Sequence, residues 1–341
     1  MYSRLLLIGL LLGLQANAQT LGGNAVFNFL SLPNTAKQSA LGGVNISSIG
    51  NDVGMAFQNP SMLRDAMHQQ VNTSFNAFIA GISNYSLTSA YHVHSIQTTM
   101  AFGVNYLNYG SITQTDASGN VYGTFRPADY VVQVMASRQY HERFRYGLTM
   151  KYIQSNYGQY RSSGLAFDVG LSYYDSSNKL QVSLVAKNMG TQLRTYDGSS
   201  AKEEIPFDLQ AGITKRLAHA PFQFSLTAQH LQNFNTYYND TSFRAAEGEL
   251  DYADSWGQKL LSHFVIATEI FLDEKLELMA GYNFQRRQDL NAYQVSNGLN
   301  GFTMGAGLLL NKLHIRYATG FYQRNMFHQF SLNFNWSGKL E

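Results

Sequence analysis

Few residues in this chain have the types and spacing that metal binding requires. His92 and His94 stand two positions apart in an alternating segment, so both side chains would lie on one face of a strand and could share a metal ion. The sequence offers no third ligand near them, and two histidines alone make a weak site. Polar histidines at the rim of the fold are the better interpretation, and we predict no metal site and no cofactor.

Acid–base and nucleophilic catalysis find no better support. Glu269 and Glu277 are a conceivable carboxylate pair, but nothing in the sequence sets the distance between them. The chain has no cysteine, phosphate-binding loop or nucleophile elbow. Its 24 Lys and Arg nearly balance 22 Asp and Glu, which leaves no charge excess to attract nucleic acid. We predict a protein that is not an enzyme and has no catalytic residues.

The composition points to a membrane protein without membrane helices. Charged residues make up only 13% of the 341 residues, whereas 45% are hydrophobic. Residues 1–18 combine Arg4, an apolar run and Ala16-Asn17-Ala18, which predicts a secretory signal peptide cleaved after Ala18. No later apolar run approaches the roughly 18–20 residues of a membrane helix. An exported chain embedded in lipid must then be a closed barrel, because only helices and closed barrels satisfy their backbone groups there.

Period-two alternation of apolar and polar residues predicts the strands. Leu148 and Met150 fall on one face of such a segment, whereas Thr149 and Lys151 fall on the other, and Ile153 alone breaks the polar face. A soluble β sandwich would alternate in the same way and remains the alternative. The predicted strands lie near 69–80, 84–94, 96–110, 128–140, 143–157, 160–174, 178–190, 205–217, 221–233, 262–273, 275–286, 299–310, 312–323 and 326–336.

Loop lengths favour the membrane barrel over the sandwich. Tight connections alternate with a set that contains every long one, namely 111–127, 191–204, 234–261 and 287–298. Bacterial outer-membrane barrels have an even number of strands, short periplasmic turns and longer external loops. We predict an all-β fold, an antiparallel transmembrane barrel of about 14 strands in residues 69–341, located in the bacterial outer membrane. Both termini would lie on the periplasmic side.

Residues 19–68 lack sustained alternation. They include a possible short helix near 35–41 and are too apolar for the alternative, a flexible linker. We predict an N-terminal hatch, or plug, packed inside the barrel. The residues that define its motif are Gly42, Gly43, Asn59 and Pro60, and Asn59-Pro60 is expected to form a fixed turn.

The inward-facing residues of the predicted strands fit such a plug. Their charges nearly cancel, whereas an ion-selective pore would carry one sign at its constriction; they are Arg145, Lys151, Lys187, Arg216 and Arg316 against Asp168, Asp208, Glu269 and Glu277. We expect salt-bridged packing against the hatch. Inward glycines would leave room for it: Gly103, Gly147, Gly170, Gly212, Gly281, Gly305 and Gly307.

Acidic residues occur together with aromatic residues in the longest loop, 234–261. Its Tyr237, Tyr238, Tyr252 and Trp256 form a candidate partner-docking loop, because aromatic anchors dominate the energetics of protein interfaces. A solvated external loop with aromatics at the lipid interface is an equal alternative.

Short motifs at the start of the chain carry a likeness to a known family. They are Gly22-Gly23, Phe27-Asn28-Phe29-Leu30 with Pro33, Ala40-Leu41-Gly42-Gly43, Asn51-Asp52 and Asn59-Pro60-Ser61. This segment resembles the PorV/PorQ family of FadL-like outer-membrane proteins of the type IX secretion system. The resemblance implies a non-enzymatic barrel that scaffolds the cell-surface attachment complex for secreted proteins, among outer-membrane lipids and with PorV, PorU and PorZ-like partners. The alternative is a FadL-like transporter of hydrophobic small molecules.

Overall fold

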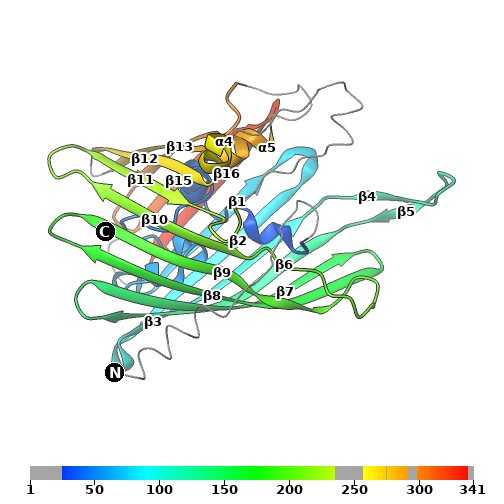
Figure 1. The fold of residues 1–341 in the computed structure, drawn as a ribbon, viewed down its shortest axis with the longest axis horizontal. Coiled ribbons are helices and arrows are strands. Elements are labelled where there is room, and N and C mark those ends of the chain that lie inside the picture. Colours follow the sequence, from blue (N-terminus) through cyan, green and yellow to red (C-terminus); the bar gives the residue numbers. More distant parts are fainter. Residues whose placement is uncertain (1–24, 235–255, 274, 291–297, 337–341) are drawn as a thin grey trace.

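A computed structural model describes residues 25–234, 256–273, 275–290 and 298–336 (Figure 1). Fourteen strands close into one antiparallel barrel, in which β1 pairs with β16. This confirms the predicted fold class, and each predicted segment overlaps one barrel strand. The barrel strands are β1 (Gln70–Ala77), β2 (Ser83–Val93), β3 (Thr98–Asn108), β6 (Ala128–Tyr140), β7 (Phe144–Tyr157), β8 (Tyr160–Asp175), β9 (Leu180–Arg194), β10 (Asp208–Arg216), β11 (Phe222–Ala228), β12 (Phe264–Asp273), β13 (Leu276–Asn283), β14 (Phe302–Leu309), β15 (Leu313–Tyr322) and β16 (Asn325–Asn335).

The two ends of the barrel differ as the loop lengths predicted. Short turns follow β2, β6, β8, β10, β12 and β14 and meet at one end, which we call the tight-turn end. The long connections meet at the opposite, long-loop end, where helices α4 (Trp256–Ser262) and α5 (Phe284–Asp289) pack on each other. In the same place a hairpin of β4 (Ile112–Thr115) and β5 (Val121–Phe125) projects beyond the barrel (Figure 1). The sequence had predicted only a loop there.

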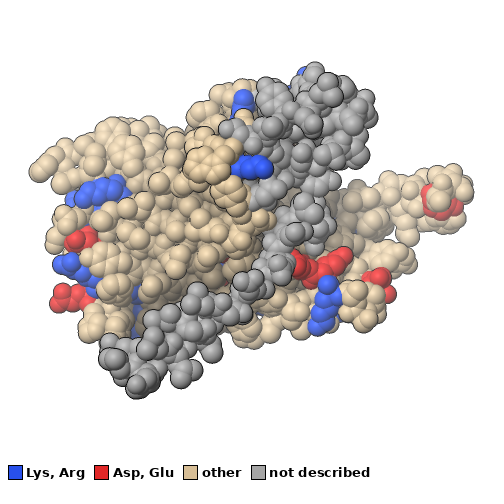
Figure 2. Space-filling model, viewed as in Figure 1, with Lys and Arg blue, Asp and Glu red and all other residues tan. Residues whose placement is uncertain are grey.

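The outer face of the wall is apolar and the inner face is polar. Leu148 and Met150 expose 55% and 52% of their surface outward, whereas Thr149 and Lys151 are buried inside. A soluble sandwich would bury the apolar face instead, so the alternation describes a wall that faces lipid. On the face shown in Figure 2, Lys, Arg, Asp and Glu gather toward the two ends of the barrel. Among the described residues, no helix is long and apolar enough to cross a membrane.

Residues 25–69 form a hatch inside the barrel. Helix α2 (Ala36–Ala40), near the predicted helix, packs against β13 to β16, and the side chain of Thr35 caps its N-terminus. Four 3-10 turns complete the hatch: η1 (Asn28–Ser31), η2 (Val53–Phe57), η3 (Pro60–Met62) and η4 (Asp65–Met67). Turn η3 packs against β6, β7 and β8, and η2 packs against β1 and β2. The hatch therefore touches the wall around most of its circumference.

Glycines in the wall let the hatch backbone approach closely. A Cβ atom added at Gly147 would collide with the backbone of Pro60 and Ser61, and one at Gly281 would collide with the backbone of Gly42. Six of the seven inward glycines face the hatch, two of them its backbone and four its side chains, whereas the seventh faces the side chain of Glu277. The six are Gly103, Gly147, Gly170, Gly212, Gly281 and Gly305, and the seventh is Gly307.

The expectation that both termini lie at the tight-turn end concerns residues outside those described, but the first described residue lies at the other end. Ala25 forms a parallel bridge with Glu204, in the connection between β9 and β10 at the long-loop end. β16, by contrast, ends at Asn335 at the tight-turn end. Phe27 and Phe29, both 4% exposed, are buried among apolar wall residues near the long loops. The hatch therefore runs the length of the lumen.

Replacing Gly147 by Ala tests the close approach of hatch and wall. Elsewhere in a strand, Ala is favoured over Gly by about 0.5–1 kcal/mol. Here the new methyl group meets backbone atoms, so we expect the free energy of unfolding in urea to fall by about 1–3 kcal/mol. Gly298→Ala is the control, because a Cβ at Gly298 meets no atom within 4 Å. A Gly147→Ala protein as stable as the control would show that the hatch does not pack there.

Candidate functional site

The lumen has two zones. In the polar zone, charged and amide side chains join residues 34–67 of the hatch to the wall. In the apolar zone, toward the long loops, residues 26–32 pack against apolar wall side chains. The first zone fixes the hatch, and the second is the part of the lumen whose chemistry suits an apolar solute.

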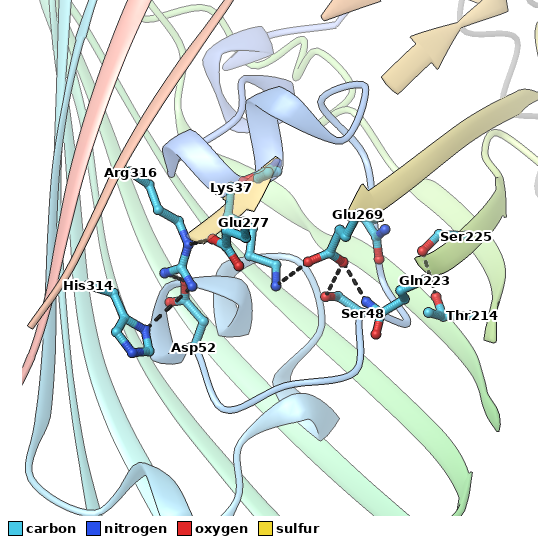
Figure 3. A network of polar contacts seen from close by, with 12 residues as sticks. Lys37, Ser48, Asp52, Thr214, Gln223, Ser225, Glu269, Glu277, His314 and Arg316 are labelled. Carbon is cyan, nitrogen blue, oxygen red and sulfur yellow. Dashed lines mark hydrogen bonds and ion pairs between the residues drawn. The ribbon is translucent and has the colours of Figure 1, made fainter. Parts of the chain in front are cut away.

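Arg316 is the centre of the polar zone (Figure 3). This β15 residue is 4% exposed, its Nη1 donates to Asp52 Oδ2 of the hatch at 2.7 Å, and its Nε donates to Glu277 of β13. Asp52 also caps η2 by accepting from the backbone N–H of Gly54 at 2.8 Å. One guanidinium thereby joins the hatch to two strands of the wall.

A second buried ion pair lies beside it. Lys37 Nζ of helix α2 is 2.7 Å from Glu269 Oε2 of β12, and Glu269 also accepts from Ser48 and Gln223 (Figure 3). Burial lowers the pKa of Lys37, but Glu269 and Glu277 outweigh it and the pKa is raised, so Lys37 stays protonated. Glu269 and Glu277 are each bound to a cation and do not form a pair for acid–base catalysis.

The other inward charges divide between hatch and wall. Arg145 donates to the backbone oxygen of Leu63 in the hatch at 3.0 Å, whereas Lys151 pairs with Asp168 within the wall at 2.7 Å. Asp208 lies 3.4 Å from His230, Arg216 stacks on Phe271, and Lys187 is buried without an ion pair among the described residues. Salt-bridged packing against the hatch therefore accounts for some of these charges and not for all.

The motif residues hold opposite sides of the hatch. Gly42 and Gly43 have φ of 85° and 86°, which favours glycine, and Gly42 N–H donates to Thr303 Oγ1 on β14 at 3.0 Å. Across the lumen, Asn59 is extended before Pro60, which opens η3. Asn59 Oδ1 accepts from the N–H of Ser61 at 3.0 Å.

The candidate partner-docking loop stays a prediction. Tyr237, Tyr238 and Tyr252 lie outside the described residues, and Trp256 is 68% exposed at the start of α4.

The two histidines predicted to share a face meet a third that the sequence did not single out. The rings of His92 and His94 are 4.7 Å apart, and His68 Nδ1 of the hatch accepts from the N–H of His92 at 3.0 Å. No group of three His, Cys, Asp or Glu that could hold a metal ion occurs in the part of the chain described.

The start of the hatch packs into the apolar zone. Its members are Val26, Phe27, Phe29, Leu30, Leu107, Val131, Ile153, Ala166 and Ile205. Ile153, which broke the polar face of its strand, belongs here and is fully buried. A cavity of about 10 Å³ between Phe29, Phe57 and Lys151 has room for about one water molecule.

The wall beside the apolar zone has a break in its hydrogen-bond ladder. Pairing of β9 with β10 stops at Lys187 and Asp208, and the next residue, Asn188, has a φ of 58°. Beyond it, side chains replace the ladder: Asn188 Nδ2 donates to Pro206 O at 2.9 Å, and Gln192 Oε1 accepts from Glu203 N–H at 3.0 Å. We call residues 203–207 the seam segment.

The hatch holds the inner side of the seam segment. Val26 N–H donates to Glu204 O at 2.8 Å, and Ile205 packs into the apolar zone. Toward β11, Gln232 Nε2 donates to Phe207 O at 2.8 Å, in a stretch beyond Ala228 where the predicted strand had been too long. The sequence had assigned 191–204 to a connection, so neither the extension of β9 to Arg194 nor its side-chain bonds to the seam segment was expected.

Comparisons with solved structures agree on the fold. A mutant of the TodX monoaromatic hydrocarbon channel aligns over 88% of this chain and 96% of its own, with 13% identity and a TM-score of 0.52. The CymD monoaromatic hydrocarbon channel aligns over 89% and 96%, with 10% identity and a TM-score of 0.51. A Pseudomonas aeruginosa FadL homologue aligns over 89% of this chain and 98% of its own, with 9% identity and a TM-score of 0.49.

Such identities establish a likeness of fold alone. No protein-family model matches the sequence, and no curated protein matches it significantly.

A double-mutant cycle tests how the hatch is held. Lys37→Met leaves the Glu269 carboxylate buried without its cation, and removing one partner of a buried pair typically costs about 3–5 kcal/mol. We expect Lys37→Met to lower the free energy of unfolding by that amount. The double variant with Lys37→Met and Glu269→Gln should lose less. Lys202→Met is the control, because Lys202 is exposed in a loop. A Lys37→Met protein no less stable than this control would contradict the role of the pair.

Proposed function

We propose that the protein is a non-enzymatic outer-membrane channel for small apolar molecules. The observation that carries the proposal is the apolar zone lying against a wall segment that side chains, rather than a β ladder, hold in place. The fold likeness to two monoaromatic hydrocarbon channels supports it. The outward apolar surface of the wall supports membrane insertion, and the long-loop end would face the outside.

Opening would start at the seam segment because a few neutral hydrogen bonds from side chains, and no β ladder, hold it to β9. A neutral hydrogen bond adds about 0.5–1.5 kcal/mol net, whereas breaking a buried ion pair of the polar zone costs several times more. A solute that displaces residues 26–32 also removes the bond from Val26 to Glu204. The solute would then pass between β9 and β10 while Arg316 and Lys37 keep the rest of the hatch in place.

A reversible cross-link tests this route. The chain has no native cysteine, so Ala25→Cys with Glu204→Cys gives one disulfide across the parallel bridge. We expect cells producing the oxidised protein to lose accelerated toluene uptake and to regain it after reduction. Ser83→Cys with Asn108→Cys, a register pair of β2 and β3, is the control and should transport in both states. Equal uptake by oxidised and reduced Ala25/Glu204 protein would reject the route.

We propose a scaffold for surface attachment of secreted proteins as the second function. The observation that favours it is the β4–β5 hairpin, on which Val121 and Tyr122 are 67% and 69% exposed. Its only charged residue between 111 and 125 is Asp116. An uncharged, open hairpin edge is a ready partner for another chain. PorV, PorU and PorZ-like proteins are the partners implied by the PorV/PorQ resemblance.

Shortening the hairpin separates the two functions. Replacing residues 112–125 by an Asn-Gly turn removes the exposed edge without touching the lumen. If the scaffold function holds, surface retention of secreted cargo should fall while toluene uptake is unchanged. Val121→Ser with Tyr122→Ser keeps the hairpin and should give a smaller loss. Full retention of cargo by the shortened protein would reject the scaffold function and leave the channel proposal untouched.

A further inference from the structure

A buried carboxylate without a counter-ion lies at the mouth of the lumen. Asp129, near the long-loop end of β6, is 1% exposed. Its Oδ2 accepts from the hydroxyls of Tyr109 at 2.6 Å and Tyr157 at 2.9 Å, whereas its Oδ1 has no hydrogen-bond partner. Among the described residues, no Lys, Arg or His forms an ion pair with Asp129.

Further oxygen atoms face the same place. Ser155 lies directly across from Asp129 in the β6–β7 register, is fully buried, and its Oγ interacts with the carboxylate without a hydrogen bond of good geometry. The hydroxyls of Tyr157 and Tyr109 are 3.4 Å apart. The ring of Tyr196, from the connection after β9, lies 5.4 Å from that of Tyr157. The hydroxyls of Ser155, Tyr109 and Tyr157 therefore surround one buried carboxylate that has no cation beside it in the part of the chain described.

Simple electrostatics indicates what is missing. A buried carboxylate is costly unless a positive charge or a full set of donors compensates it. All the polar atoms here are oxygens, which suit hard cations and ammonium groups rather than transition metals. A single carboxylate balances one positive charge. The tyrosine rings add a favourable surface for a cation.

We propose that Asp129, Ser155, Tyr109 and Tyr157 form a binding site for a singly charged cationic group, either an alkali metal ion or a primary ammonium group. The site joins elements that are far apart in the sequence. Tyr109 and Asp129 flank the β4–β5 hairpin, and Tyr109 and Tyr196 both pack against the apolar zone. A bound cation therefore stiffens the base of the hairpin and the mouth of the lumen together.

Cation-dependent stability tests the site. The refolded protein is heated in NaCl, KCl, methylammonium chloride or N-methylglucamine chloride at equal ionic strength, so that screening is constant. N-methylglucamine is too large to enter. We expect a saturable rise in Tm of about 2–4 °C with the small cations over N-methylglucamine. A rise with NaCl or KCl identifies an alkali ion, and a rise with methylammonium alone identifies an ammonium group.

Variants assign the effect to these residues. Asp129→Asn should have the same Tm in all four salts. Tyr157→Phe keeps the carboxylate and should need a several-fold higher cation concentration for half of the shift, which decides the matter if Asp129→Asn does not fold. Asp116→Asn is the matched control: Asp116 also accepts from a tyrosine, Tyr122, but it is only half-buried and lies in the hairpin, so this variant should respond fully.

Two results would overturn the proposal. One is a wild-type Tm that is the same in all four salts, as expected if the Asp129 carboxyl is simply protonated. The other is a cation response of Asp129→Asn or Tyr157→Phe that equals the wild-type response.

Discussion

A peptide group in the hydrocarbon of a bilayer has no water to bind, and the rest of this structure follows from that constraint. It requires a closed ladder, and the ring from β1 to β16 provides one. Side chains alone fill the interior at about eight strands, so a barrel of fourteen encloses space that something else must occupy. The hatch occupies it, and its own backbone groups then need partners on the wall. Wall glycines such as Gly147 and Gly281 let those groups approach, and polar side chains such as Thr303 bind them.

The way the hatch is held decides which part of it is free to move. Arg316 and Lys37 tie its middle to β12, β13 and β15 through buried ion pairs, each of which leaves an uncompensated charge if broken. Its first residues, 26–32, are held by apolar contact and by one bond to the seam segment. In the proposed channel, an apolar solute would offer the same kind of contact and so could take the place of these residues. Such a solute has no charge that could replace the carboxylates paired with Arg316 and Lys37.

Alternation predicted the wall well because lipid and lumen select opposite side chains at every second residue. It even placed Lys151 and Arg316 inside, where each finds an acidic partner. It could not predict that Arg316 binds Asp52 or that Lys37 binds Glu269, because these pairs join residues more than two hundred positions apart. It also missed the hairpin, whose two faces are both exposed, and the break at Asn188, where side-chain amides take over from the ladder. These features depend on which distant residues meet in the folded chain, so the periodic pattern of the sequence does not indicate them.

Transport and scaffolding place different demands on the long-loop end, and the geometry lets both be met. A channel needs the seam segment to open, whereas a docking surface needs the hairpin to stay fixed. The seam lies between β9 and β10, but the hairpin is anchored on β3 and β6, where Tyr109 and Asp129 meet. Tyr196 stands between the two regions, on the connection that leads into the seam. A positive charge beside Asp129 would hold the hairpin side rigid, so that among the described residues the seam, whose bonds are neutral, is where the mouth of the lumen would yield.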